Sequence, residues 1–491
     1  MGIVAGVDSS TQSCTVELRE ANGGLLLGTG SAPHPNTTPP VSEQTVEAWW
    51  DAFTTAWGRA LGSAQCAPEN IRGISVAAQC HGMVLLDKSG NVLRPVKLWN
   101  DTTSAPQAEA LEEEFGRDNW AKTVGSVPTA AFTITKLAWL AANEPDLLQQ
   151  VATVLLPHDY LTWRLTGKFV TDRSEASGTG YYAAHENRWL PELLERFVDS
   201  SRDWHSMLPE VLGPEDGAGQ ANTVDAQKLG LRSDTVVGAG AGDQHAGALG
   251  MGLKPGEVLY SLGTSGVVMT PCAEPVHDLT GWVDGVADAT GGYLPLVCTL
   301  NSAKVTDFVA QLLGIDYDEL ARLALAADRF DERPIFAAYL EGERSPSLPC
   351  ASGTLTGIRT TTTREAIALA AIEGVLLGLV RGHRKLTQQG ISANGRVFVA
   401  GGGARSLAYR QILADILQVP IHVRDVPEAT ARGACIQAAA LVQEAPLGDV
   451  RDKWEPEIIN TTEPRFAEYD RIFQQYIQLA RFSGDTPWED S

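Results

Sequence analysis

Several patterns that mark common classes of protein are missing from this sequence of 491 residues. Its seven cysteines include no C-x-x-C pair, which disfavours both a disulfide framework and a zinc cage. Its nine histidines include no H-E-x-x-H motif. No run of about 18 apolar residues occurs, so we expect no transmembrane helix. The first residues lack the basic segment and cleavage site of a secretory signal, and we therefore expect a cytoplasmic protein.

Positive charge is also scarce, because 38 basic residues stand against 60 acidic ones and leave a net charge of −22. This balance disfavours nucleic acid and anionic membranes as partners. It does not disfavour an anionic nucleotide, which binds locally through backbone N–H groups and a metal ion. Hydrophobic residues make up 44% of the chain, as in a soluble globular protein. The length exceeds that of one ordinary core, so we expect two domains.

The most informative stretch is Val236–Gly250, where a short apolar run leads into alternating glycines and then a single carboxylate, Asp243. The glycines allow a sharp turn and the close approach of a ligand. No basic residue lies beside Asp243 in the sequence, so its side chain could accept a proton. An aspartate after a glycine turn can also simply cap a helix. The stretch alone leaves both interpretations open.

A second candidate site follows the first predicted strand, Ile3–Val7. Asp8 ends this strand and leads into a loop of small hydroxyl residues, Ser9–Ser13. The hydroxyls and loop amides could hold phosphoryl oxygens, and the carboxylate could hold Mg²⁺. An Asx turn in an ordinary hairpin is the alternative.

The same layout of strand, hydroxyl loop and strand returns at Glu257–Thr270. This weak internal repeat suggests a nucleotide clamped between two duplicated halves. The second loop has no acid at the position of Asp8, so only the first loop could serve a metal ion.

Two further loops could bind ligands. His81 lies in a turn between two predicted strands and could bind a polar ligand, although a satisfied loop histidine is the alternative. Gly401–Ser406 joins a predicted strand, Val397–Ala400, to a predicted helix, Leu407–Leu417. This context favours a nucleotide, because the turn exposes backbone N–H groups and the start of a helix attracts negative charge.

A long apolar helix is predicted at Thr363–Gln389, with Gly374, Gly378 and Gly382 on one face. Each glycine costs about 1 kcal/mol relative to alanine in a helix. Close packing of another backbone would offset this cost, and we expect that packing at the junction of the two domains.

Together these separated pieces resemble the FGGY family of carbohydrate kinases, which belongs to the actin-like ATPases. The likeness rests on the Asp8–Ser13 loop, the Gly-Asp-Gln-His block at 242–245, Leu-Gly-Thr-Ser-Gly at 262–266 and Gly-Gly-Gly-Ala-Arg-Ser at 401–406. Gln-Cys-His-Gly at 79–82 and Leu-Trp-Asn-Asp at 98–101 resemble the xylulokinase subfamily. The resemblance implies an α/β fold of two actin-like (ribonuclease H-like) ATPase domains with a catalytic cleft between them. We expect an N-terminal sugar-binding domain at 1–246, a C-terminal nucleotide-binding domain at 247–443, and a tail with a helix at 444–491.

The resemblance also implies roles for single residues. Asp243 would be the general base that takes the proton of a sugar hydroxyl, and Asp8 would help to place Mg²⁺, with Asp8 and Asp243 as the metal ligands. The sugar would be bound by Gln79, Cys80, His81, Gln244 and Asp101. ATP would be bound by Thr11, Gly263, Thr264, Gly401, Gly402, Gly403 and Ser406. Since FGGY kinases are often dimers, a homodimer belongs to these expectations.

The sequence departs from the family pattern at Ser10, where a glycine is usual, and at Cys80, where the xylulokinases usually have methionine. The implied activity is ATP-dependent phosphorylation of a ketopentose, D-xylulose to D-xylulose 5-phosphate. Other sugars or polyols (ribulose, gluconate, glycerol, a pentitol) stay open as acceptors. An actin-like or chaperone-type ATPase without a sugar substrate, and a catalytically impaired regulator, are the alternatives of other classes.

Overall fold

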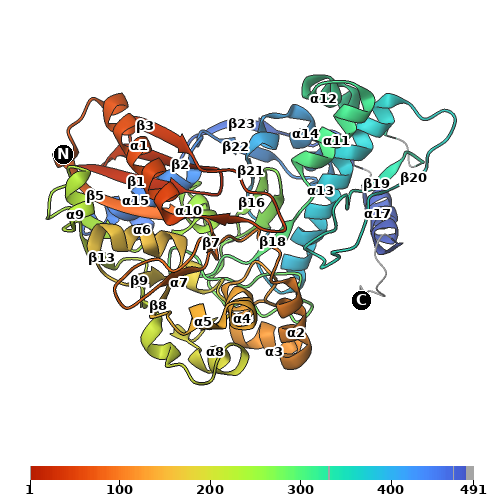
Figure 1. The fold of residues 1–491 in the computed structure, drawn as a ribbon. Helices are drawn as coiled ribbons and strands as arrows, with labels where there is room; N and C mark the ends of the chain where they lie inside the picture. Colours follow the sequence, from red (N-terminus) through yellow and green to blue (C-terminus); the bar gives the residue numbers. More distant parts are fainter. Residues whose placement is uncertain (1, 330–331, 468, 483–491) are drawn as a thin grey trace.

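Two β-sheets, one in each half of the chain, organise the fold (Figure 1). The structure is a computed structural model, and it describes residues 2–329, 332–467 and 469–482. The first sheet has the order β13 (Gly217–Gln220), β14 (Val236–Gly238), β5 (Ile71–Ala78), β1 (Ile3–Ser9), β2 (Ser13–Glu20) and β3 (Leu26–Pro33), and β15 (Ala241–Gly242) also pairs with β5. The second has the order β18 (Leu296–Thr299), β17 (Gly266–Met269), β16 (Val258–Leu262), β21 (Val397–Ala400), β22 (Ile421–Arg424) and β23 (Ile458–Thr462).

The two sheets repeat the same pattern of strand directions. In the first sheet, β1, β2 and β3 are antiparallel neighbours, β5 and β14 run parallel to β1, and β13 is antiparallel at the edge. In the second sheet, β16, β17 and β18 are antiparallel neighbours, β21 and β22 run parallel to β16, and β23 is the antiparallel edge. The predicted internal repeat is therefore confirmed, and it extends to the whole sheet. The edge strand β23 lies in the segment predicted as a tail.

Helices lie on both faces of each sheet, so the central strands β1, β5 and β16 are mostly buried. The helices that flank the first sheet are α1 (Val46–Ala64), α6 (Pro157–Thr166) and α15 (Ala429–Gln443). Side chains of a strand alternate between faces. Ala5 and Val7 of β1 pack with α1 and α6, whereas Val4 packs with α15. Asp8, at the end of β1, falls on the same face as Val4 and therefore lies toward α15.

Two helices cross between the halves. α10 (Asp243–Gly250) follows the first sheet but contributes Ala248 to a cluster with the second sheet, while α15 follows the second sheet and covers β1 and β5 of the first. Glycines let the two helices touch: a Cβ at Gly250 would lie 1.8 Å from the carbonyl oxygen of Ala429, and one at Gly433 would lie 1.9 Å from that of Ala246. The predicted boundary at 246/247 falls inside α10, which both halves share.

The face of the second sheet opposite to α10 is covered by α11 (Ala303–Leu313), α12 (Tyr317–Ala326), α13 (Arg364–Gln388) and α14 (Leu407–Leu417). The helix α17 (Asp470–Phe482) packs beside them. Of the described helices, only α13 is long and apolar enough to cross a membrane, and most of it is buried in this core. Close packing of another backbone is confirmed at Gly374, where a Cβ would lie 2.5 Å from the Phe336 carbonyl oxygen, whereas a Cβ at Gly382 would lie 2.8 Å from the side chain of Val297. The expectation that this packing joins the domains is wrong, because both neighbours belong to the second half.

A helical lobe is inserted between β5 and β14 and has its own core. Its main helices are α2 (Ala105–Phe115), α3 (Arg117–Val124), α4 (Thr133–Asn143), α5 (Pro145–Leu148) and α8 (Pro191–Phe197). The shorter helices elsewhere are α7 (Arg173–Ala176), α9 (Val224–Lys228) and α16 (Leu447–Lys453). The remaining strands form small two-stranded pairs: β4 (Glu43–Gln44), β6 (Val84–Leu86), β7 (Val96–Lys97), β8 (Thr153–Leu155), β9 (Val170–Asp172), β10 (Tyr182–Ala183), β11 (Arg188–Trp189), β12 (Glu210–Leu212), β19 (Ile335–Ala337) and β20 (Thr354–Thr356).

Candidate active site

The carboxyl ends of three parallel strands meet at one edge of the first sheet. Asp8 lies within β1 near its end, the Gln79–Gly82 turn follows β5, and Asp243 follows β15. Because β1 and β15 both pair in parallel with the end of β5, these residues come together although they are far apart in the sequence. The carboxyl edge of such a sheet is where α/β proteins usually bind ligands.

Asp243 begins α10 and faces the space between the halves. Its Oδ1 accepts hydrogen bonds from the backbone N–H of Gln244 at 2.7 Å and from the Cys80 thiol at 3.4 Å. Thr430 of α15 donates to its carbonyl oxygen at 3.2 Å. Burial raises the pKa of the Asp243 carboxyl to about 6, and the two hydrogen bonds oppose that rise. The carboxylate is therefore ionised near neutral pH, yet basic enough to take a proton.

Asp8 lies close to Asp243 in a second acidic environment. Burial, together with the nearby carboxylates of Asp243 and Glu428, raises the pKa of the Asp8 carboxyl to about 8. Ser10, which stands where the family usually has glycine, donates its hydroxyl to Asp8 Oδ1 and lowers this pKa. Neither Asp8 nor Asp243 forms an ion pair with another described residue. Neighbouring buried carboxylates without a cation fit the oxygen ligands that Mg²⁺ prefers.

His81 is held rigidly in the turn after β5. Its φ of 63° lies in the left-handed region, and its backbone N–H donates to Glu175 Oε1. Its ring stacks on Phe132 with centroids 5.3 Å apart. Lys136 Nζ donates to its carbonyl oxygen at 3.1 Å. Burial lowers the pKa of His81 well below its usual value, so the ring is neutral and can both donate and accept hydrogen bonds to hydroxyl groups.

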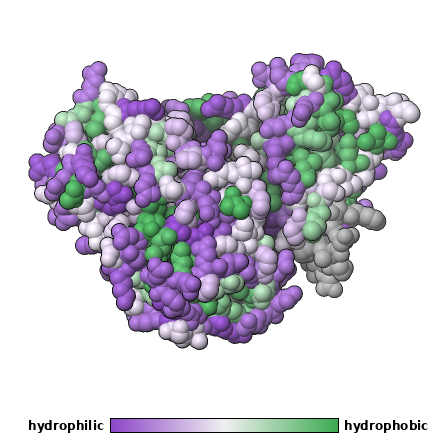
Figure 2. All heavy atoms as spheres, viewed as in Figure 1, coloured by the Kyte–Doolittle hydropathy of each residue, from purple (hydrophilic) through white to green (hydrophobic). Residues whose placement is uncertain are grey.

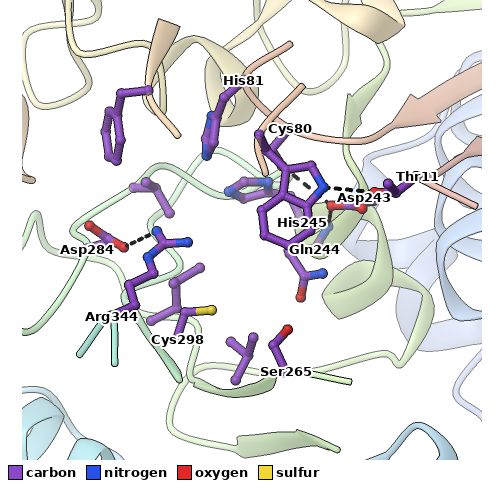
Figure 3. A pocket seen from close by; sticks show the side chains of 15 residues that line it. Thr11, Cys80, His81, Asp243, Gln244, His245, Ser265, Asp284, Cys298 and Arg344 are labelled. Atoms are coloured by element: carbon purple, nitrogen blue, oxygen red, sulfur yellow. Dashed lines mark hydrogen bonds and ion pairs between the residues drawn. The ribbon is translucent and has the colours of Figure 1, made fainter. Parts of the chain in front are cut away.

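A cavity lies between the two halves and is lined from both (Figure 3). The first half contributes Thr11, Cys80, His81, Asp243 and Gln244, and the second contributes Ser265, Cys298 and Arg344. Figure 2 shows the surface notched above this region, between the lobe of the first sheet and the lobe built around α13. The predicted base and most of the predicted sugar-binding residues therefore share one cavity with Ser265 of the loop between β16 and β17.

Two of the predicted sugar-binding residues do not line this cavity. Asp101 is fully buried, and its two oxygens accept hydrogen bonds from the Ser42 N–H at 2.9 Å and from Lys97 Nζ at 3.2 Å. Gln79 is also buried and donates to Gln44 Oε1 at 3.3 Å. Both oxygens of Asp101 are thus occupied by neighbouring protein groups, whereas the side-chain oxygen of Gln79 is buried without a hydrogen-bond partner among the described residues.

The predicted nucleotide loops lie together at the corresponding edge of the second sheet. Gly263 and Thr264 follow β16, Gly401 follows β21, and these two strands are parallel neighbours. Gly401 has a φ of 82°, and a Cβ there would lie 2.7 Å from the Leu262 carbonyl oxygen. Thr264 and Gly402 are exposed, Gly403 packs on Leu262, and Ser406 begins α14. This edge presents backbone N–H groups and a hydroxyl, and it reaches the cavity through Ser265.

Some residues at the cavity were not found from the sequence. Arg344 enters from the second half and pairs with Asp284 at 3.0 Å. Trp99 donates its indole N–H to Thr11 Oγ1 at 2.8 Å, which fixes the first hydroxyl loop. Glu175 and His245 lie beside Cys80. His245 and Trp99 lie within the Gly-Asp-Gln-His and Leu-Trp-Asn-Asp motifs, although no role was predicted for them, whereas Arg344 and Glu175 carry no local signal and depend on the tertiary fold.

Comparison with known proteins decides the family. The models of the N-terminal and C-terminal domains of FGGY carbohydrate kinases match residues 3–250 and 258–442. The chain belongs to the FGGY family of carbohydrate kinases. It is thus an ATP-dependent sugar kinase, and the predicted pair of actin-like domains is confirmed.

Named FGGY relatives include the xylulose kinase of Streptomyces coelicolor, which is 38% identical over 92% of this chain and 90% of its own length. The crystal structure of the xylulose kinase from Bifidobacterium adolescentis has a TM-score of 0.85 and 36% identity, covering 97% of this chain and 99% of that one. The gluconate kinase from Lactobacillus acidophilus has a TM-score of 0.89 at 23% identity and covers 98% of both chains. The last similarity concerns the fold alone, so the fold does not select the sugar.

Proposed function

We propose that this FGGY kinase phosphorylates a ketopentose, D-xylulose, at its 5-hydroxyl group. The observation that carries the proposal is the position of Asp243, an acceptor of protons in a cavity between the His81 turn and the hydroxyl loop of the second half. The named relatives with the higher identities are xylulose kinases, which supports xylulose as the acceptor.

The chemistry follows from these residues. Asp243 takes the proton of the sugar hydroxyl as the hydroxyl oxygen forms a bond to the γ-phosphorus of ATP. The bond from that phosphorus to the β–γ bridging oxygen breaks. The products are the sugar phosphate, ADP and one proton. Phosphoryl transfer depends on positioning and on neutralising charge, with little covalent help from protein. His81 and Cys80 would orient the ketose, because both side chains face the cavity beside the base.

The second half would hold the nucleotide at the Gly263–Thr264 and Gly401–Gly403 loops, with Ser406 and Thr11 nearby. Exposed backbone N–H groups of glycine turns bind phosphate oxygens. Asp8 and Asp243 would hold Mg²⁺, which supplies positive charge to the transferring phosphoryl group. The cluster of unpaired carboxylates around Asp8 supports this assignment. The homodimer stays a prediction from the family resemblance, and the cytoplasmic location stays a prediction from the sequence.

A coupled assay of ADP release over a panel of acceptors tests the proposal. The panel contains D-xylulose, ribulose, gluconate, glycerol, a pentitol and a reaction without acceptor. We expect the highest kcat/KM with D-xylulose and little ADP release without a sugar. Strong activity with a polyol and none with D-xylulose would overturn the proposed substrate. ATP turnover that is independent of every acceptor would overturn the role of the cavity as a sugar site.

A further inference from the structure

Three side chains that carry a thiol, a carboxylate and an imidazole gather beside the cavity. Cys80 follows β5, Glu175 lies in α7, and His245 lies in the first turn of α10. One potential ligand atom of each lies within 4.8 Å of the other two. Glu175 is 0% exposed and His245 is 3% exposed, whereas Cys80 reaches the cavity. Figure 3 shows Cys80 and His245 next to each other beside Asp243.

The three donors surround a space that a glycine leaves open. A Cβ built on Gly242 would lie 2.5 Å from Glu175 Oε2, 2.7 Å from His245 Nδ1 and 2.8 Å from Cys80 Sγ. Any other residue at Gly242 would fill this space. The three atoms thus converge from separate elements on one small volume.

His245 supplies an independent sign that a partner is missing. Both of its ring nitrogens lack a hydrogen-bond partner among the described residues, although the side chain is almost fully buried. A neutral imidazole normally places its N–H and its lone pair against partners when it is buried. One ring nitrogen faces the space at Gly242, where a ligand would satisfy it.

We propose that Cys80, Glu175 and His245 bind a soft divalent cation such as Zn²⁺. Thiolate, imidazole and carboxylate are the usual zinc ligands, and three of them leave a fourth position open, here toward the cavity. Bond lengths of about 2.0–2.3 Å imply donor separations of about 3.3–3.8 Å, so the side chains must close in slightly on binding. The Cys80 thiol gives its proton to solvent as the sulfur–metal bond forms.

This site is chemically distinct from the predicted Mg²⁺ ligands, Asp8 and Asp243. Mg²⁺ prefers oxygen donors, whereas a thiolate selects Zn²⁺. Zinc at Cys80 removes the hydrogen bond from the thiol to Asp243 and occupies the sugar side of the cavity. We therefore expect Zn²⁺ to inhibit in competition with the sugar and not with ATP. This consequence rests on the proposed function, whereas binding itself does not.

The test uses the full-length protein after a chelator has removed bound metal. The protein is titrated with Co²⁺, a spectroscopic substitute for Zn²⁺, in the presence of excess Mg²⁺. We expect one equivalent to bind with a thiolate-to-cobalt absorption band, which Zn²⁺ then abolishes. Cys80→Ser should lose the band, and His245→Gln should weaken binding at least about tenfold. Cys350→Ser is the matched control, because it removes an exposed thiol and should keep the band.

Absence of the thiolate band in the wild-type protein would overturn the site, and so would a band that persists in Cys80→Ser. If circular dichroism shows that Cys80→Ser is misfolded, alkylation of the wild-type protein decides: one equivalent of Zn²⁺ should protect Cys80, and unchanged alkylation would overturn the proposal. Metal binding without competition against the sugar would support the site and overturn its inhibitory effect.

Discussion

The carboxyl edges of the two sheets share a strand pattern but carry different chemistry. The edge of the first sheet holds Asp8, His81 and Asp243, whereas that of the second holds glycines and hydroxyl residues around Gly263 and Gly401. Because backbone direction is the same in both, the strand ends alone do not decide which ligand is bound. In the proposed function the side chains at these ends divide the work, with the proton and sugar assigned to one edge and the phosphates to the other.

The comparison also explains why the two edges act together. α10 starts at the first edge and packs on the second sheet, and α15 returns from the second sheet to the first. Asp243 is the first residue of α10, and Thr430 of α15 donates to its carbonyl oxygen. The proposed base is therefore attached to both halves, so a movement between them would change its position.

The strongest test of this division removes the base alone. We expect Asp243→Asn to lower kcat for sugar phosphorylation by about 10²–10⁴-fold, the usual contribution of general base catalysis. ATP affinity measured without Mg²⁺ should change little, because the nucleotide itself is assigned to the other edge and the metal role proposed for Asp243 is then excluded. Steady-state kinetics and fluorescent-nucleotide binding measure the two quantities.

Asp316→Asn is the matched control, because it makes the same chemical change at the exposed N-cap of α12. Its kcat should stay at the wild-type value. Wild-type turnover in Asp243→Asn would remove this carboxylate from the mechanism. An equal loss of ATP binding and turnover would show that the two edges do not divide the work.

The second edge is tested by Gly401→Ala. Gly401 has a positive φ, and the added methyl group would meet the Leu262 carbonyl oxygen, so the loop must shift. A left-handed non-glycine residue costs about 1–3 kcal/mol, which corresponds to a rise of about tenfold in KM for ATP. KM for the sugar should stay nearly constant, and steady-state kinetics with each substrate varied in turn measures both.

Gly390→Ala provides the matched control for this strain. Gly390 has a similar φ of 79°, yet nothing lies within 4 Å of an added Cβ, and it follows α13 away from both edges. Its KM for ATP should equal that of the wild type. If Gly401→Ala raises KM for the sugar instead, the nucleotide assignment of this loop is wrong.

Much of the frame could be predicted from the sequence because local chemistry marked it. The hydroxyl loop after Asp8, the glycine turn before Asp243 and the Gly401–Gly403 loop each stand at the end of a strand, and parallel strands bring such ends together. The packing of α10 and α15, each on the sheet of the other half, could not be predicted. The small residues at their crossing resemble those of α13. Both sets of glycines allow close packing, but sequence does not state against which partner.

The walls of the cavity were harder to predict than its edges. Arg344 and Asp284 come from loops of the second half, and nothing in their neighbours indicates a ligand. Asp101 shows the opposite error: its motif resembles that of sugar-binding residues, but Lys97 and the Ser42 N–H occupy its oxygens. A side chain's direction depends on contacts across the fold, so residue type and spacing leave it undetermined.

The smallest expected effect is on the pH dependence of the free energy of unfolding, to which the two edges contribute differently. His34 follows β3 and lies beside Ser9 at the first edge, whereas the residue that follows β18 in the second sheet is Leu300. Burial lowers the pKa of His34 from 6.5 to about 4, so between these values the unfolded chain binds more protons than the folded one. The contribution of His34 to the free energy of unfolding therefore falls as pH drops through this window, by about 1 kcal/mol between about pH 7 and about pH 5.5.

His34→Gln should remove this part of the pH dependence, which urea unfolding at both pH values measures. His205→Gln is the control at an exposed histidine and should keep the wild-type dependence. If His34→Gln loses as much stability on acidification as the wild type does, the proton uptake lies elsewhere. His34 would then not contribute to the difference between the two edges.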